Sequence, residues 1–250
     1  MFYVPLRIIY KGSYFTLHLM LAFHISLFAP VFLGSQWHKT KTGKKLCMWW
    51  SIRTSNILGL VIKQHGCPQR TATLFTANHI SFLDIIVLSA ITPVKFLAKD
   101  TLRYWPVIGF ISSSIGTVFI KRGNRHVIHK TIKTIGDVLE QEQSLVIFPE
   151  GTTTPGDSVK KFNSGLFQAA INASKPIQPV ALRYIRNGKP DRIAAYTNND
   201  NFIISLIKIM AQTRIEVQLY YCSVLESNEY TRSELALNSH AIISDVVSYK

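Results

Sequence analysis

The residues best suited to chemistry are His79 and Asp84, which have four residues between them. They follow an apolar, strand-like run at residues 73–76. An imidazole titrates near neutrality, and when a carboxylate orients it, it can take a proton from a hydroxyl. No Ser or Cys stands nearby in a sharp Gly-flanked turn, and no second His lies at metal-ligand spacing. The pair therefore favours direct deprotonation of a substrate alcohol over a covalent enzyme intermediate or a metal site.

The spacing of this pair requires a particular local structure. Five steps along an α-helix turn a side chain through about 500°, which would leave His79 and Asp84 on different faces. They can meet if His79 lies on the turn after the strand and Asp84 in the first turn of the following helix. Ser81 is then the predicted N-cap. The same spacing also fits a plain capping box, in which Asp84 serves only the helix end and His79 is a satisfied strand-end histidine.

Two more motifs follow apolar runs further along the chain. Residues 148–152 contain Glu150, then Gly151 and Thr152, which can approach a polar headgroup closely. Residues 116–122 end in a Lys-Arg pair that could bind a phosphate. Ligands of open α/β sheets gather at the carboxyl ends of strands, so one cleft could hold His79 and the motif at residues 148–152. The plainer alternatives are an ordinary strand-to-loop turn and a pair of solvated cations.

Short apolar runs alternate with longer helical patterns from about residue 72 onward. This order predicts an α/β domain with a mostly parallel central sheet flanked by helices. The last predicted strand alternates apolar and polar residues, as an edge strand would. The predicted strands are residues 73–76, 94–98, 117–120, 145–148, 178–184 and 214–221. The predicted helices are residues 125–142, 164–173, 202–211 and one that begins at the capping-box spacing of Thr231 and Glu234.

The N-terminal part of the chain is both basic and apolar. Residues 1–70 contain nine Lys or Arg and no acidic residue, in a chain of formal net charge +14. Residues 14–33 are 20 residues without charge, about the length that crosses a bilayer core, and residues 46–62 indicate a second, amphipathic helix. Trp37 stands near Lys39 and Lys41 after the first segment, and further Trp, Lys and Arg residues follow up to Arg53. Trp beside Lys and Arg is typical of a membrane interface.

These features predict a membrane-associated helical pair over residues 1–66 and a catalytic domain over residues 67–250. The Lys-rich flank places the catalytic domain on the cytoplasmic side, at the inner membrane, and favours an anionic membrane surface. Whether the apolar segment spans the bilayer or enters one leaflet stays open, and a buried helical hairpin in a soluble protein is the alternative. No small-residue cleavage site follows the segment, which argues against a cleavable signal peptide.

Other classes of protein fit less well. The three cysteines are widely spaced and indicate neither a disulfide framework nor a metal site. A nucleic-acid binder is suggested by charge alone, because no stacking motif or recognition helix is evident. A non-catalytic membrane-binding protein would have no need for His79, Asp84 and Glu150 together.

Four short blocks in order resemble those of the glycerolipid acyltransferases, and most closely the bacterial 1-acyl-sn-glycerol-3-phosphate acyltransferases. The resemblance covers residues 77–180, and a membrane-associated N-terminal segment also fits that family. The blocks are Asn78-His79-x4-Asp84, Gly116-x-x-Phe119-Ile120-x-Arg122, Phe148-Pro149-Glu150-Gly151-Thr152 and Ile177-Gln178-Pro179-Val180.

The resemblance implies a role for each block. His79 would be the general base and Asp84 would orient it. Arg122 would hold the phosphate of the acceptor, and Gly116 and Phe119 would shape that site. Glu150, Gly151 and Thr152 would complete acceptor binding. The fourth block would line the acyl-donor side. The implied partners are a lysophospholipid acceptor and an acyl-CoA or acyl-carrier-protein donor, with no cofactor and no metal.

The third block departs from the commonest pattern of the family. That pattern continues with Arg and Ser, where this chain has Thr153 and Thr154. Losing the Arg removes one phosphate-binding cation, which Lys160 and Lys161 could replace in part. Enzymes that acylate lyso-ornithine lipids also resemble this pattern. From the resemblance we expect the acceptor to be 1-acyl-sn-glycerol 3-phosphate, and the departure in the third block makes lyso-ornithine lipid the alternative.

Overall fold

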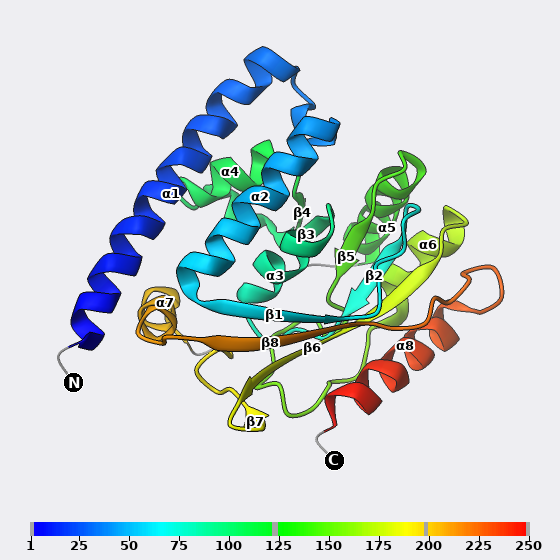
Figure 1. Ribbon diagram of the computed structural model, residues 1–250. Coiled ribbons are helices and arrows are strands. Elements are labelled where there is room, and N and C mark those ends of the chain that lie inside the picture. The colour runs from blue at the N-terminus through cyan, green and yellow to red at the C-terminus, as the bar shows by residue number, and fades with distance from the viewer. Residues whose placement is uncertain (1–2, 122–124, 198–199, 249–250) are drawn as a thin grey trace.

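An eight-stranded sheet forms the centre of the molecule, in a computed structural model that describes residues 3–121, 125–197 and 200–248 (the backbone only for Arg125 and His126; Figure 1). Along the sheet the strands follow the order β1-β8-β6-β2-β5-β3-β4, and β7 pairs with β6. The strands are β1 Leu60–His65, β2 Leu74–Ala77, β3 Lys95–Lys99, β4 Val118–Ile120, β5 Leu145–Ile147, β6 Ile177–Arg186, β7 Lys189–Pro190 and β8 Ile215–Tyr221.

Helices connect these strands and precede them. They are α1 Tyr3–Leu33, α2 Lys41–Leu58, α3 Leu83–Ile91, α4 Ile108–Ser114, α5 Arg125–Glu140, α6 Gln168–Asn172, α7 Phe202–Met210 and α8 Arg232–Val247, with short 3-10 turns η1 Trp37–Lys39, η2 Asp100–Tyr104 and η3 Ser164–Phe167. The predicted helix 164–173 is thus η3 followed by α6. At the start of α8 the predicted capping box is confirmed, since Thr231 Oγ1 accepts from Glu234 N and the Glu234 carboxylate accepts from Thr231 N.

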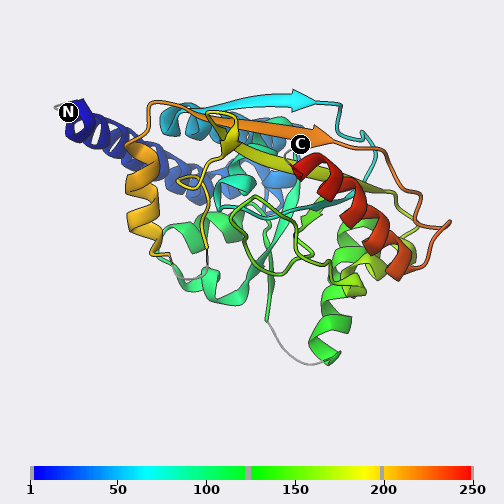
Figure 2. The same ribbon diagram turned by 90° about the horizontal axis from the view of Figure 1, so that it is seen from below.

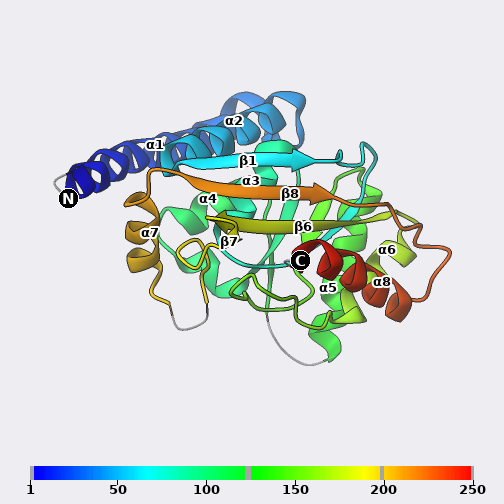
Figure 3. The ribbon, with the colours of Figure 1, turned by 60° about the horizontal axis from the view of Figure 1, so that its bottom comes forward.

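The sheet is mostly parallel, as predicted. β2 pairs in parallel with β5 and β6, and β3 pairs in parallel with β4 and β5. β8 is antiparallel to β6, and β1 pairs in parallel with β8 (Figure 3). These two strands and the short β7, which is also antiparallel to β6, run against the other five.

Two sequence predictions fail at this side of the sheet. Helix α2 ends at Leu58 rather than continuing to residue 62, because Gly59 adopts a left-handed conformation (φ 83°) and ends it. The residues that follow form β1, which pairs along its length with β8. β8 is therefore internal and not an edge strand. Its alternation has another cause, because Ile215, Val217 and Leu219 enter the core on one face and the other face is half-exposed.

Apolar cores lie on both faces of the sheet. One is shared by α2, α3 and α7, and the other by α5, α6 and α8 (Figures 1 and 2). The crossovers that leave β2 and β5 run in opposite directions along the sheet, β2 toward β3 and β5 toward β6. Strand ends at such a switch point leave a crevice for a ligand. The candidate residues at the ends of β2 and β5 thus lie where the fold provides a site.

Helix α1 has its polarity reversed relative to a helix of a soluble domain. Among the described residues it alone is long and apolar enough to cross a bilayer. Its buried stripe is small or polar, whereas its exposed side chains are large and apolar. Two cations join its N-terminal part to the domain: Arg7 donates to the carbonyl of Ala211 (2.8 Å), and Lys11 Nζ to those of Leu58 (2.9 Å) and Gln212 (2.8 Å). The apolar face of α1 is left without a protein partner among the described residues.

Candidate active site

The turn after β2 is held in place by neighbouring segments. The buried Asn78 side chain donates to the Leu182 carbonyl (3.0 Å) and accepts from the Leu182 N–H (2.8 Å), which extends the β2–β6 pairing by one residue. The Thr154 N–H donates to the His79 carbonyl (2.8 Å). The His79 N–H donates to Glu150 Oε1 (2.8 Å). The backbone of the histidine is therefore fixed before its side chain is considered.

The predicted pair is formed: His79 Nδ1 lies 2.8 Å from Asp84 Oδ2. His79 stands on the turn after β2 and Asp84 in the first turn of α3, which is the arrangement that the spacing required. The imidazole also stacks on the Phe148 ring, with 4.0 Å between ring centroids. Its side chain is 20% exposed and that of Asp84 is fully buried. With Nδ1–H donated to the carboxylate, Nε2 is the ring nitrogen left to accept a proton from a substrate.

Asp84 is satisfied on both of its oxygens. Oδ2 also accepts from the backbone N–H of Ile80 (2.8 Å) and of Ser81 (3.0 Å). Oδ1 accepts from the Tyr184 hydroxyl (2.8 Å). Burial, and then the neighbouring Asp84 carboxylate, raise the pKa of Tyr184, so the phenol stays protonated as a donor. These four donors stabilise the carboxylate and fix the direction in which it faces the imidazole.

The predicted N-cap at Ser81 is wrong. The helix begins at Leu83, and its N-cap position is Phe82, whose side chain makes no capping hydrogen bond. Ser81 Oγ is buried and has no hydrogen-bond partner among the described residues. The reason is that Asp84 Oδ2 faces His79 and also accepts hydrogen bonds from the backbone N–H groups of Ile80 and Ser81. Asp84 thus serves the helix end and the histidine at once, so the two alternatives of the sequence are not exclusive.

Glu150 joins the ends of β2 and β5. While Oε1 accepts from the His79 N–H, Oε2 accepts from the Lys160 N–H (2.9 Å). Burial raises the pKa of Glu150, and the two backbone donors oppose that shift. The carboxylate therefore supports the turn that carries His79. Gly151 adopts φ 70°, a left-handed backbone conformation that favours glycine over other residues. Binding of the acceptor by Glu150, Gly151 and Thr152 stays a prediction.

The second block lies further from His79. β4 is the edge strand, three strands away from β2, so its backbone is roughly 14 Å from that of β2. Gly116 (φ 79°) packs against the His38 ring, where a Cβ would come within 2.6 Å of Nε2. Phe119 lies under the Arg103 guanidinium at 4.8 Å. Arg122 falls outside the described residues, so its predicted phosphate contact stays a prediction.

Tyr184 is the residue that the sequence did not single out. It lies 100 positions from Asp84 in the chain and meets it because β6 runs beside β2. A strand pattern gives its burial but not its partner.

We expect Tyr184→Phe to lower the rate of acyl transfer by roughly 5–30-fold, because Asp84 loses one donor worth about 1–2 kcal/mol. The effect should appear in kcat with KM little changed. The control is Tyr220→Phe, because the Tyr220 hydroxyl donates to Gln218 Oε1 (2.9 Å), remote from Asp84. Equal kcat in the Tyr184→Phe variant and the unaltered chain would remove Tyr184 from the site.

Comparisons with known proteins agree with this geometry. The sequence model of the Acyltransferase family matches residues 60–183. The lyso-ornithine lipid O-acyltransferase of Pseudomonas aeruginosa is 34% identical over 79% of this chain and 76% of its own length. The 1-acyl-sn-glycerol-3-phosphate acyltransferase of Neisseria gonorrhoeae is 31% identical over 69% of this chain and 68% of its own.

The fold also matches a solved structure. The crystal structure of a 1-acyl-sn-glycerophosphate acyltransferase from Thermotoga maritima superposes with a TM-score of 0.71, covering 97% of this chain and 94% of that one at 20% identity. That likeness supports the fold, and the two relatives above support the family. This chain belongs to the Acyltransferase family.

Proposed function

We propose that this acyltransferase moves an acyl chain from acyl-CoA or acyl-carrier protein to the sn-2 hydroxyl of 1-acyl-sn-glycerol 3-phosphate, which gives phosphatidic acid. The observation that carries the proposal is the His79–Asp84 hydrogen bond at the carboxyl end of β2. It presents Nε2 of a partly exposed imidazole at a switch point of the sheet, where an alcohol can reach it.

The chemistry needs one proton acceptor and no covalent enzyme intermediate. The acceptor oxygen attacks the thioester carbonyl carbon while His79 Nε2 takes the hydroxyl proton. Asp84 stabilises the imidazolium that forms. The tetrahedral intermediate then collapses, the carbon–sulfur bond breaks, and the thiolate leaves and takes the proton. The products are an ester and a free thiol, so atoms and charge balance.

The second candidate acceptor is lyso-ornithine lipid. It is favoured by the 34% identity to the Pseudomonas enzyme and by Thr153, which stands where the commonest third block has Arg. Lys160 and Lys161 are both exposed on the same loop and offer cations for a phosphate. The two acceptors differ in headgroup charge, so the cations of this loop should decide between them.

A labelled-thioester assay tests the acceptor, with 1-acyl-sn-glycerol 3-phosphate, lyso-ornithine lipid and glycerol 3-phosphate side by side. The proposal expects the highest kcat/KM for the first. Thr153→Arg should raise kcat/KM for that phosphate acceptor, with Asn172→Arg, on α6, as the matched control. A clear preference for lyso-ornithine lipid would replace the proposed acceptor and leave the acyltransferase chemistry intact.

We also propose that α1 lies against an anionic lipid leaflet, at the cytoplasmic face of the inner membrane. Its large apolar side chains face outward, whereas its small and polar ones face the domain. Such packing suits a lipid environment. Arg7 and Lys11 hold α1 along the domain, which favours entry into one leaflet.

For this contact we expect Phe28→Glu/Phe32→Glu to release the protein from vesicles of anionic lipid. The two side chains are 52% and 80% exposed, and burying charge in hydrocarbon is costly. Leu237→Glu on α8 is the control, because Leu237 is 67% exposed on another helix. Vesicle flotation measures the bound fraction. Full retention of the double variant would contradict contact through this face.

A further inference from the structure

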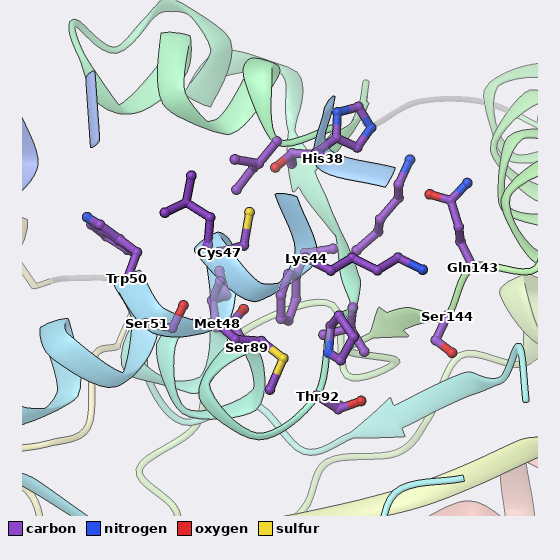
Figure 4. A pocket seen from close by; sticks show the side chains of 18 of the residues that line it. His38, Lys44, Cys47, Met48, Trp50, Ser51, Ser89, Thr92, Gln143 and Ser144 are labelled. Carbon is purple, nitrogen blue, oxygen red and sulfur yellow. The ribbon is translucent and has the colours of Figure 1, made fainter. Parts of the chain in front are cut away.

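A cavity lies between the N-terminal helices and the sheet, and His79 is not among its lining residues (Figure 4). Its volume is about 430 Å³. This falls in the range of small-molecule sites. Its walls include parts of α1, η1, α2, α3, β3 and α4, and they are largely apolar, with Trp37, Ile85 and Ile111 among the lining residues.

The cavity opens at the amino ends of the strands, opposite the end that carries the candidate active site. Residues 68–72 precede β2, residues 92–94 precede β3, and Gln143 and Ser144 precede β5, and all of these segments contribute to the lining. His79 and Glu150 stand at the carboxyl ends of β2 and β5. Between cavity and imidazole lie two aromatic layers: Phe96 lines the cavity and stacks on Phe148 (6.5 Å), which stacks on His79 (4.0 Å).

One end of this cavity is cationic. Lys44 of α2 and Lys95 of β3 line it, and neither forms an ion pair with any described residue. The carboxylate among the lining residues, Glu142, is ion-paired with Lys175. Figure 4 shows the Lys44 side chain on the same side of the cavity as His38, Gln143 and Ser144, whereas Cys47 and Trp50 lie on the opposite side.

The cations are close enough to disturb one another. Burial, and then the charges of Lys39 and Lys44, lower the pKa of Lys95 to about 8. Burial, Lys95 and Lys39 lower the pKa of His38 to about 4, so this ring is neutral and can donate one N–H. Both His38 ring nitrogens are buried, and neither forms a well-aligned hydrogen bond with a described residue, although the backbone of Ser114 lies near enough to oppose the pKa shift in part. An anion at this end would offset the mutual repulsion and engage the imidazole.

We propose that the cavity binds an anionic single-chain amphiphile, with its phosphate or carboxylate head on Lys44 and Lys95 and its chain along the apolar walls. The head chemistry has two sources, a lysolipid phosphate or a fatty-acid carboxylate. This site is independent of the proposed acceptor of the acyl group, because it does not include His79.

The test uses the full-length protein and four probes below their micelle-forming concentrations: dodecyl phosphate, dodecanoate, dodecanol and inorganic phosphate. Calorimetry gives each Kd. We expect at least one of the two anionic amphiphiles to bind at least tenfold more tightly than both dodecanol and inorganic phosphate. Tighter binding of dodecyl phosphate assigns the lysolipid head, and tighter binding of dodecanoate assigns the fatty acid. Equal binding of dodecanol would overturn the cationic head site.

Variants locate the bound probe. Lys44→Gln/Lys95→Gln should weaken the anionic probes at least tenfold and leave dodecanol unchanged. Lys45→Gln, the exposed neighbour on α2, is the matched control. Ser89→Phe, which fills the cavity wall, should weaken all three chain-bearing probes, and thermal unfolding without probe verifies that the variants fold. Loss of binding in His79→Ala, or no effect of the Lys44/Lys95 change, would place the probe elsewhere and overturn the proposal.

Discussion

His79→Ala should lower the rate of acyl transfer by about 10²–10⁴-fold, the usual contribution of a general base. The variant loses Nε2, the proposed proton acceptor, which the hydrogen bond of Nδ1 to Asp84 leaves available. The fold should survive, because the side chain is partly exposed and the turn is held by backbone bonds to Glu150 and Thr154.

The control for this variant is His65→Ala. His65 is exposed on β1 and stacks on Tyr220 (4.3 Å), remote from Asp84. It should retain the rate of the unaltered chain. Vesicle flotation and thermal unfolding of both variants separate loss of chemistry from loss of membrane contact or of fold. Near-normal turnover by His79→Ala would remove the histidine from the mechanism.

Asp84→Asn should be comparably severe, with about a 10⁴-fold loss of kcat if the pair behaves like the His–Asp part of a Ser-His-Asp triad, where that change has this cost. An amide removes the charge that stabilises the imidazolium. It also brings an NH₂ group to a position surrounded by donors from His79, Tyr184 and two backbone amides. At least one donor would then be unsatisfied in a buried site, so unfolding free energy should fall by about 1–3 kcal/mol.

A matched change elsewhere separates these two effects. Asp137→Asn removes a carboxylate from an exposed ion pair with Lys133 on α5, and such pairs contribute little. It should alter neither kcat nor stability measurably. If Asp84→Asn lowered stability while kcat stayed normal, Asp84 would serve the helix end alone.

The fold was predictable where the pattern is local. Apolar runs with clear boundaries predicted most of the strands, and α5, α7 and α8 begin at the expected residues. β1 was not predicted, because Val61 and Ile62 continue the apolar pattern of α2 and only the backbone of Gly59 marks the break. β8 was wrongly predicted to be an edge strand. Alternating apolar and polar residues show that one face of a strand is buried, but they do not show whether the strand has one neighbour or two.

The candidate site divides in the same way. His79 and Asp84 lie within six residues, so turn geometry alone brought them together. Tyr184 and the two backbone contacts of Glu150 depend on how β6 and β5 lie beside β2, which no local pattern specifies. Arg122 lies outside the described residues, and the division of the chain at residue 66 stays a prediction.

The most direct test of the central claim is transfer of a labelled acyl chain from acyl-CoA to a lysolipid hydroxyl, with the unaltered chain and His79→Ala at equal concentration in anionic vesicles. The account predicts labelled diacyl lipid and a stoichiometric amount of free thiol from the unaltered chain, and at least a hundredfold less from the variant. No labelled product from the unaltered chain with either lysolipid, or equal product from both proteins, would contradict it.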